Sequence, residues 1–249
     1  MRVAVVGATG RIGKTTIEAL RRRGHEAVPI SRSSNGVDAY TGSGLDEALQ
    51  GVDALIDVSN TRSQNENEIV HFFGTSTANL LAAEVRTGVS HHVLLSIVGI
   101  EKGQRVPHYQ GKREQERLVT SGAVPWSVVR STQFLDFAAQ VASWTLHEGV
   151  ATIAPLLVQP IAHRDVGDAL ADVATGEPLR RHVDIAGPET QDLVDMARRT
   201  FEARGEKVSL VPTWRGAFDT SMSGEVLLPN DGARIGRVTF EDWLAEGAS

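Results

Sequence analysis

The chain has 249 residues, no cysteine and a formal net charge of −6, with a sequence pI near 5.8. This length predicts one elaborated domain around one core, and the acidic balance argues against a nucleic-acid partner. The absence of cysteine excludes disulfides, thiolate nucleophiles and zinc-thiolate sites, and no apolar stretch has the length of a membrane span.

The N-terminal part begins with an apolar run over 3–6 that predicts a buried strand, followed by apolar residues at helical spacing. Because this strand begins at residue 2, there is no room for a signal peptide, and we expect a cytoplasmic protein. Further apolar runs predict strands over 27–30, 37–40 and 54–58, with a short helix over 45–49.

A long helix ending at Gly88 is expected next, since apolar residues recur at helical spacing: Ile69, Phe72, Phe73, Leu80, Leu81 and Val85. Strands over 93–98 and 126–129 flank a helix over 109–120. Apolar strands that alternate with helices are typical of a parallel sheet covered on both faces. We therefore predict an α/β fold with a doubly wound parallel sheet.

After Arg130 the alternation loosens. The later elements are, in order, a helix through Val166, Leu170 and Val173, a strand over 182–186, a helix over 193–201, a strand over 207–211 and a helical turn at 240–244. The irregular pieces around 131–160 and 212–236 are expected to roof a pocket beyond the carboxyl ends of the strands. We predict a single domain over 1–249, in which 131–160 and 176–249 contribute the substrate-binding part.

Glycines at positions 7, 10 and 13 join the first strand to its helix. Gly7 permits a tight turn, Gly10 lets the backbone approach a pyrophosphate, and Gly13 lets the helix pack closely on the sheet, with its N-terminal amides facing the phosphates. After an apolar strand, this spacing predicts an NAD(P)-binding Rossmann fold. The predicted cofactor contacts in this turn are Gly7, Thr9, Gly10, Arg11, Ile12 and Gly13.

The same stretch is one residue away from the phosphate loop of nucleotide triphosphatases, which has a glycine where Ala8 stands. The strand that ends at Asp57 also has the pattern of a magnesium-binding strand. The dinucleotide motif, however, has every glycine in register, so Lys14 and Thr15 are interpreted as surface residues of the first helical turn. A phosphate-loop nucleotide phosphatase is a remote alternative.

Ser31 and Arg32 follow the second strand, where an NAD-preferring site places an acid that binds the ribose hydroxyls. This chain has no acid at that position. The Arg32 guanidinium suits a 2′-phosphate, because its planar fork of donors matches phosphate oxygens. NADP(H) is therefore the predicted cofactor, with NAD(H) less favoured.

Further along the chain, additional motifs join the glycine turn: 94–99, 108–116, 121–134, 163–169, 185–189 and 227–236. Together they resemble the NmrA-like, atypical branch of the short-chain dehydrogenase/reductases, and the likeness covers nearly the whole chain. The combination is far more specific than the glycines alone. It is most similar to a bacterial subgroup of NAD(P)H-binding oxidoreductases.

The resemblance implies a Tyr-x-x-x-Lys pair, in which the lysine holds the nicotinamide ribose and the tyrosine protonates the carbonyl being reduced. Lys112 matches the lysine, but His108 stands four residues before it and Tyr109 three. Either can share a helix face with Lys112. A third possibility, that neither residue is catalytic, stays open. His108 is favoured, because it keeps the family spacing and titrates near neutrality. Ser96 lies near the family's catalytic serine and is either catalytic or structural.

The resemblance also places Asn60 beside the nicotinamide ribose and Gln133 at the nicotinamide end. The implied function is an NADPH-dependent reductase that transfers hydride to a carbonyl or activated double bond of a small, aromatic or quinone-like molecule. The alternative is a non-catalytic NADP(H)-binding redox sensor. No metal site is predicted, since His91 and His92 are adjacent rather than spaced along a helix. We expect a monomer or homodimer.

Overall fold

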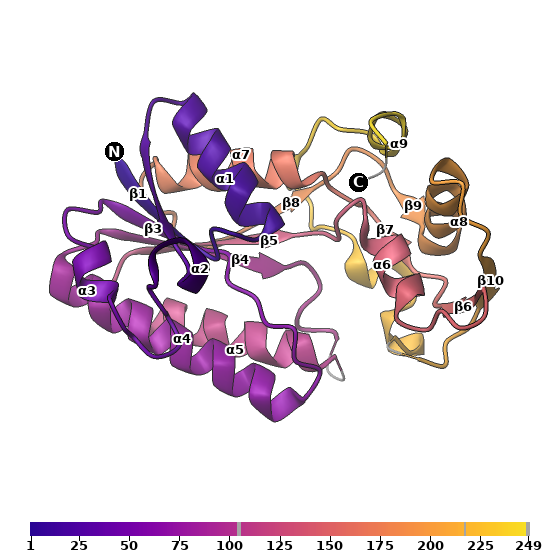
Figure 1. The fold of residues 1–249 in the computed structure, drawn as a ribbon, viewed down its shortest axis with the longest axis horizontal. Helices are drawn as coiled ribbons and strands as arrows, with labels where there is room; N and C mark the ends of the chain where they lie inside the picture. The colour runs from indigo at the N-terminus through magenta and orange to yellow at the C-terminus, as the bar shows by residue number, and fades with distance from the viewer. Residues whose placement is uncertain (104–105, 217, 248–249) are drawn as a thin grey trace.

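The computed structural model describes residues 1–103, 106–216 and 218–247 (Figure 1). Within them, seven strands form one sheet in the order β2-β1-β3-β4-β5-β8-β11, and all neighbours pair in parallel. These strands are β1 (Arg2–Val6), β2 (Glu26–Ile30), β3 (Ala54–Asp57), β4 (His91–Ile97), β5 (Trp126–Ser131), β8 (His182–Ala186) and β11 (Arg234–Ile235). The predicted doubly wound parallel sheet is confirmed.

Helices cover both faces of this sheet (Figure 1). On one face, α1 (Arg11–Arg22) packs against α7 (His163–Ala174). On the other face, α4 (Glu66–Thr87) packs against α5 (Pro107–Ser121). Because successive side chains of a strand point to opposite faces, the sheet contributes to separate apolar cores: one lies under α1 and α7, another under α4, and a small one under α5. The short helix α3 (Leu45–Ala48) lies beside α4.

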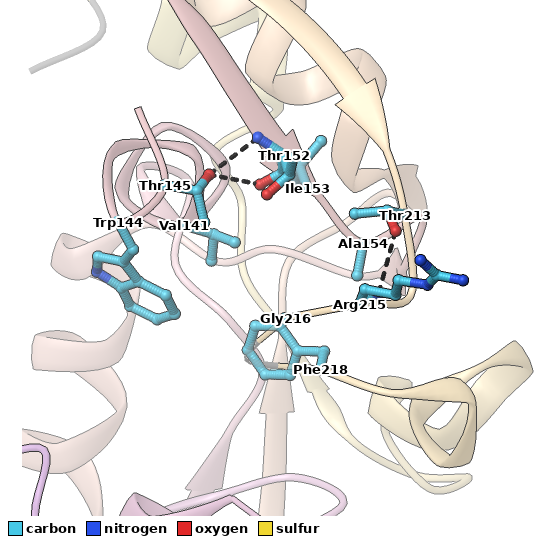
Figure 2. A pocket seen from close by; sticks show the side chains of 10 residues that line it. All are labelled: Val141, Trp144, Thr145, Thr152, Ile153, Ala154, Thr213, Arg215, Gly216 and Phe218. Carbon is cyan, nitrogen blue, oxygen red and sulfur yellow. Dashed lines mark hydrogen bonds between the residues drawn. The ribbon is translucent and has the colours of Figure 1, made fainter. Parts of the chain in front are cut away.

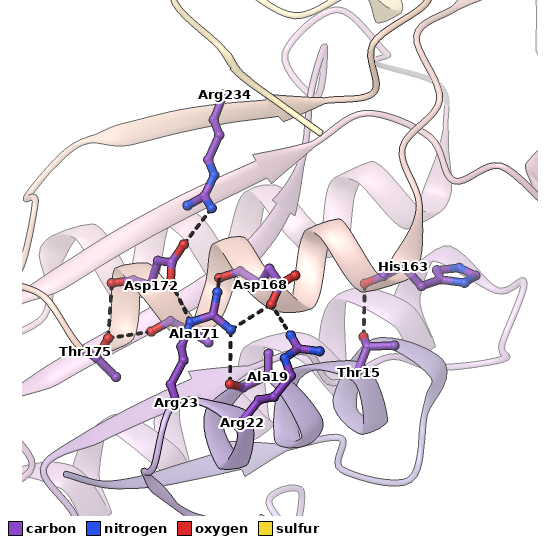
Figure 3. A network of polar contacts seen from close by, with 10 residues as sticks. All are labelled: Thr15, Ala19, Arg22, Arg23, His163, Asp168, Ala171, Asp172, Thr175 and Arg234. Carbon is purple, nitrogen blue, oxygen red and sulfur yellow. Dashed lines mark hydrogen bonds and ion pairs between the residues drawn. The ribbon is translucent and has the colours of Figure 1, made fainter. Parts of the chain in front are cut away.

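A polar seam joins α1 to α7 (Figure 3). At one end, Arg23 donates to Asp168 at 2.7 Å and to Asp172 at 2.8 Å. At the other end, the Thr15 hydroxyl donates to the backbone carbonyl of His163 at 3.0 Å. The two helices therefore run in the same direction, and their N-terminal ends lie side by side.

Beyond β5 the chain builds a second lobe beside the carboxyl end of the sheet (Figure 1). Its elements are α6 (Phe137–Ser143), β6 (Val150–Ile153), β7 (Leu157–Val158), β9 (Gln191–Asp192), α8 (Leu193–Ala203), β10 (Ser209–Pro212), two 3-10 helices (Thr220–Met222 and Gly224–Leu227) and α9 (Phe240–Ala245). Buried residues such as Leu156, Met196 and Phe240 give this lobe its own apolar core. The strand predicted over 207–211 forms as β10, but it pairs with β6 outside the main sheet.

The strand predicted over 37–40 is wrong. This segment makes a single bridge between Asp38 and Ser43 and then turns, and α2 (Arg32–Asn35) precedes it. The buried Val37 packs instead into the core formed with α3, so its apolar character reflects packing and not strand pairing. The side-chain amide of Asn79 on α4 holds the turn by donating to the carbonyl of Tyr40 at 2.8 Å.

Candidate functional site

The sheet has a switch point at the carboxyl end of β1. From β1 the chain crosses through α1 to β2 on one side, whereas β3 lies on the other side of β1. In open α/β sheets, such a point opens the crevice that binds ligands. Gly7 lies there, and its amide donates to the carbonyl of Ile30 at the end of β2 at 3.1 Å.

Each of the three glycines of the turn has a different structural role. Gly7 has φ +83°, and a Cβ on it would lie 2.7 Å from the carbonyl oxygen of Val58. A Cβ on Gly13 would lie 2.7 Å from Cα of Ala8, so Gly13 allows α1 to pack against the turn. Gly10 is extended, and a Cβ there would meet only the Gly7 carbonyl within 4 Å, at 3.3 Å. The space in front of Gly10 is therefore open.

The N-terminus of α1 begins at this open space. No side chain caps it, and its first turn carries no acidic residue. The first backbone amides of a helix have no partner within the helix, and the helix dipole makes this end an anion site. The arrangement fits a dinucleotide, whose diphosphate would lie against these amides. Thr9 is exposed beside them, whereas the Ile12 side chain is buried, so only its amide faces outward.

Arg32 is the first residue of α2, directly beyond the end of β2. Ser31 caps this helix, and its hydroxyl oxygen accepts a hydrogen bond from the Ser34 amide at 3.1 Å. The Arg32 side chain is exposed, and no carboxylate stands between Ser31 and Val37. Asn60 is also exposed and follows β3, on the opposite side of the switch point. These residues flank the glycine turn on both sides.

A family model described as NAD(P)H-binding matches residues 7–177, which is well over half of the chain. The chain belongs to the NAD(P)H-binding family. The match begins at the first glycine of the turn and continues through α7. It favours the dinucleotide interpretation of the glycine turn over the phosphate loop.

Relatives and solved structures support this assignment. A (4-alkanoyl-5-oxo-2,5-dihydrofuran-3-yl)methyl phosphate reductase of Streptomyces griseus is 28% identical over 202 residues, 75% of this chain and 68% of that protein. An NADPH-dependent quinone oxidoreductase from Escherichia coli, complexed with NADPH, has a TM-score of 0.66 at 19% identity, covering 85% of this chain and 78% of that one. A short-chain dehydrogenase/reductase superfamily protein from Agrobacterium tumefaciens with bound NAD has a TM-score of 0.74 at 16% identity, covering 100% and 96%. At these identities the structural matches show a shared Rossmann-like fold.

Lys112 lies against β4 at Leu95, one residue past the position that pairs with Asp57, the last residue of β3. Its Nζ donates to the Leu95 carbonyl at 3.0 Å and to the Gln115 amide oxygen at 2.8 Å, and lies 4.7 Å from the Phe73 ring centroid. Burial lowers the pKa of Lys112 to about 8, partly offset by Asp57 and Glu116. In this structure the ammonium is a buried group between α5 and β4. Its contact with a nicotinamide ribose stays a prediction.

His108 and Tyr109 point to different surroundings. The His108 ring packs edge-on against Phe73 at 5.4 Å, and burial together with the nearby Lys112 lowers its pKa to about 4. The Tyr109 ring belongs to the core of the second lobe, and its hydroxyl lies beside the Gln133 side chain. Burial raises the pKa of Tyr109 to about 12. Near pH 7, therefore, the imidazole is neutral and the phenol keeps its proton.

Two buried polar side chains lie near the carboxyl edges of β4 and β5. Ser96 is 2% exposed and precedes the last residue of β4, and Gln133 is 8% exposed and follows β5 by two residues. The Ser96 hydroxyl has no hydrogen-bond partner in the part of the chain that the structure describes, and the Gln133 amide makes no hydrogen bond of good geometry there, although the Tyr109 hydroxyl lies beside it. Buried groups of this kind are normally satisfied, so they are candidates for a ligand contact.

A cluster that the sequence did not reveal links Arg11 to the second lobe. The Arg11 guanidinium forms an ion pair with Asp136, just before α6, and His163 Nε2 lies 3.4 Å from the same carboxylate. The Phe134 ring packs 4.7 Å from the His163 ring. In the sequence, Arg11 lies in the glycine turn and His163 opens the motif 163–169, whereas Asp136 lies two residues beyond the motif 121–134.

The second lobe has a small apolar pocket of about 40 Å³ (Figure 2). Trp144 and Phe218 form one side of it, and Thr213 and Arg215 lie at the other. A cavity of this size holds only a few atoms.

Across 1–103, 106–216 and 218–247, no helix has the length and hydropathy of a membrane span. In the same residues, no group of three or more His, Asp or Glu side chains is arranged to hold a metal ion.

Proposed function

We propose that this protein is an NADPH-dependent reductase that transfers hydride to a carbonyl or activated double bond of a small organic molecule. The observation that carries the proposal is the uncapped N-terminus of α1 at the switch point, behind a turn whose Gly10 leaves open space. The absence of an acid beside Arg32 supports NADPH over NADH.

The bound dihydronicotinamide supplies the hydride, and the residues of this chain bind and orient the reactants. The first amides of α1 hold the diphosphate, and Arg32 and Ser31 hold the 2′-phosphate. Asn60 and Gln133 contact the nicotinamide end, because they follow β3 and β5 at the same edge of the sheet.

Tyr109 is the better supported proton donor. Its hydroxyl lies beside Gln133, near the carboxyl edge of β5, and carries its proton at neutral pH, as any phenol does. Burial raises its pKa to about 12, which makes it a weaker acid than a free tyrosine, so its position is what supports it as the donor. His108 packs on Phe73. Its pKa of about 4 means that the imidazole is neutral near pH 7, so it has no imidazolium proton to donate. The family spacing that favoured His108 in the sequence does not reveal this difference in surroundings.

The second lobe supplies the substrate-binding part, with 131–160 and 176–249 as its segments. Phe137, Trp144 and Phe218 form an aromatic group in it, with Trp144 and Phe218 stacked at 6.3 Å. Trp144 is half exposed, so its ring is free to stack on a flat, unsaturated substrate outside the small pocket. The names of two similar proteins, a quinone oxidoreductase and a reductase of a dihydrofuranone phosphate, support the same class.

The test measures consumption of NADPH in the presence of a panel of quinones, enones and butenolides. The loss of nicotinamide fluorescence is the readout. We expect at least one acceptor to give steady oxidation of NADPH and a product that carries two added hydrogens. A protein that fails to bind NADPH contradicts the proposal outright.

A non-catalytic NADP(H) sensor is the second candidate. The observation that favours it is the inward direction of Lys112, whose Nζ is held by Leu95 and Gln115. Tight binding of NADPH with no turnover of any acceptor would support this candidate against the reductase.

A further inference from the structure

Arg11, Asp136 and His163 connect the glycine turn to the loop that enters the second lobe. Arg11 is the first residue of α1, Asp136 precedes α6, and His163 is the first residue of α7. The Arg11 ion pair with Asp136, here called the Arg11 clasp, joins the helix that begins at the switch point to the segment that follows β5. The clasp stands at the helix end that the proposed function assigns to the diphosphate.

The two partners of the clasp differ in exposure. The Arg11 side chain is 67% exposed, whereas the Asp136 side chain is 10% exposed. The exposed guanidinium keeps its contact with water when it rotates away, so the cost of opening the pair falls on the buried Asp136 carboxylate. A diphosphate offers more negative charge than one carboxylate, and the dipole of α1 favours it at the same place. The two anions therefore compete for one guanidinium.

Removal of Arg11 would leave the Asp136 carboxylate largely buried, with one remaining titratable neighbour among the residues that the structure describes. That neighbour is His163, whose Nε2 lies 3.4 Å from Oδ1 of Asp136. The charged groups that face His163 from the other elements are Arg11 on α1 and Asp136 before α6, and the Phe134 ring covers it on one side. A buried carboxylate without a cation is costly, so a proton on His163 becomes favourable.

We propose that dinucleotide binding opens the Arg11 clasp: Arg11 moves from Asp136 to the diphosphate, and Asp136 then pairs with His163, which takes up one proton from solvent. This inference rests on the proposed binding of a dinucleotide, and it assigns to Asp136 and His163 a positioning role that couples cofactor binding to protonation.

The direction of the pH effect follows from the state of His163. While the clasp is closed, burial and the Arg11 charge lower the pKa of His163 to about 4, so the ring is neutral. An uncompensated Asp136 raises the pKa of the same ring in the complex. Cofactor binding therefore takes up a proton between these two values and weakens as the pH rises through the higher one.

The experiment is titration calorimetry at pH 6.5 in buffers with different ionisation enthalpies. NADH is the main probe, because the 2′-phosphate of NADPH has its own pKa near 6. The wild type should take up about half to one proton per NADH. His163→Gln replaces the imidazole with a polar side chain that does not titrate, so this variant should bind NADH with no proton uptake. Uptake in the wild type that persists in His163→Gln, or no uptake in the wild type, overturns the inference.

A mutant cycle tests the competition independently of protons. Asp136→Asn removes the competing charge, so NADH should bind about tenfold more tightly. In an Arg11→Gln background the same change should have no effect, since no guanidinium remains to be released. Lys14→Gln, which removes another cation from the first turn of α1, is the control and should leave the Asp136 effect intact. An equal gain with and without Arg11 overturns the clasp, whereas absence of NADH and NADPH binding to the wild type contradicts the proposed function itself.

Discussion

The Lys112 ammonium donates a hydrogen bond to the backbone carbonyl of Leu95, at 3.0 Å, from beneath β4 and two residues before the strand ends. The Gln115 amide oxygen accepts a second hydrogen bond from the ammonium, and the Gln115 amide nitrogen donates one to Asp57 at 2.9 Å. The lysine that matches the family motif is thus part of a buried network that joins α5 to β3 and β4. This placement makes stability, and not only catalysis, a measurable property of Lys112.

Lys112→Met should change how stability depends on pH. In the unfolded chain Lys112 holds its proton up to about its usual pKa of 10.5, whereas burial lowers the pKa in the folded protein to about 8. The unfolded state binds more protons between these values, so wild-type stability rises with pH across that window, by about 3 kcal/mol relative to the methionine variant. Urea unfolding of both proteins at several pH values measures the difference. Parallel curves would show that Lys112 carries no charge penalty.

Arg32→Ala should remove most of the preference for NADPH over NADH. A charge-assisted contact with the 2′-phosphate, partly screened by solvent, corresponds to about five- to hundredfold in affinity. NADH affinity should stay nearly unchanged, as measured by nicotinamide fluorescence. Arg21→Ala, at the far end of α1, removes the same charge away from the site and serves as the control. Equal affinity of the wild type for both cofactors would argue against Arg32 and direct attention to Arg11.

Gly10→Val should abolish cofactor binding while the protein stays folded. The extended backbone at Gly10 accepts a side chain, and its Cβ would meet only the Gly7 carbonyl, at 3.3 Å. The valine would occupy the space that the diphosphate needs. Gly13→Ala is the informative comparison, because its Cβ would lie 2.7 Å from Cα of Ala8 and should lower the melting temperature. Unchanged NADPH affinity of Gly10→Val in calorimetry would reduce the motif to a simple turn.

Tyr109→Phe should lower turnover by about 10²- to 10⁴-fold if the reductase uses this phenol as its general acid. His108→Phe should have a much smaller effect. The pH profile of the wild type separates the two donors: a phenol with a pKa of about 12 gives a rate that stays level from neutral to mildly alkaline pH. A histidine donor with a pKa of about 4 would lose activity as the pH rises above that value. Full activity of both variants would assign the proton to water or substrate.

The strand, turn and first helix of the cofactor site could be predicted from the sequence alone. Gly13 is required by contacts with the turn itself, at Ala8. Gly7 is required by its positive φ and by its close approach to Val58, just after β3. Apolar runs of four to six residues likewise predicted the central strands, because these strands are buried on both faces. Only the run at 37–40 was misassigned, since burial of Val37 in a turn gives the same apolar signal as a strand.

The surroundings of the polar side chains were decided by tertiary packing. Helical spacing put His108 and Lys112 on one face of α5, but it did not say how closely α5 approaches α4. Gly111 permits the close approach of the two helices, because a Cβ there would lie 2.7 Å from the Ile69 side chain. This approach places the Lys112 ammonium over the Phe73 ring. The pairing of Arg11 with Asp136 likewise joins residues far apart in the chain. Such contacts depend on how whole elements pack, and no local pattern of residues encodes them.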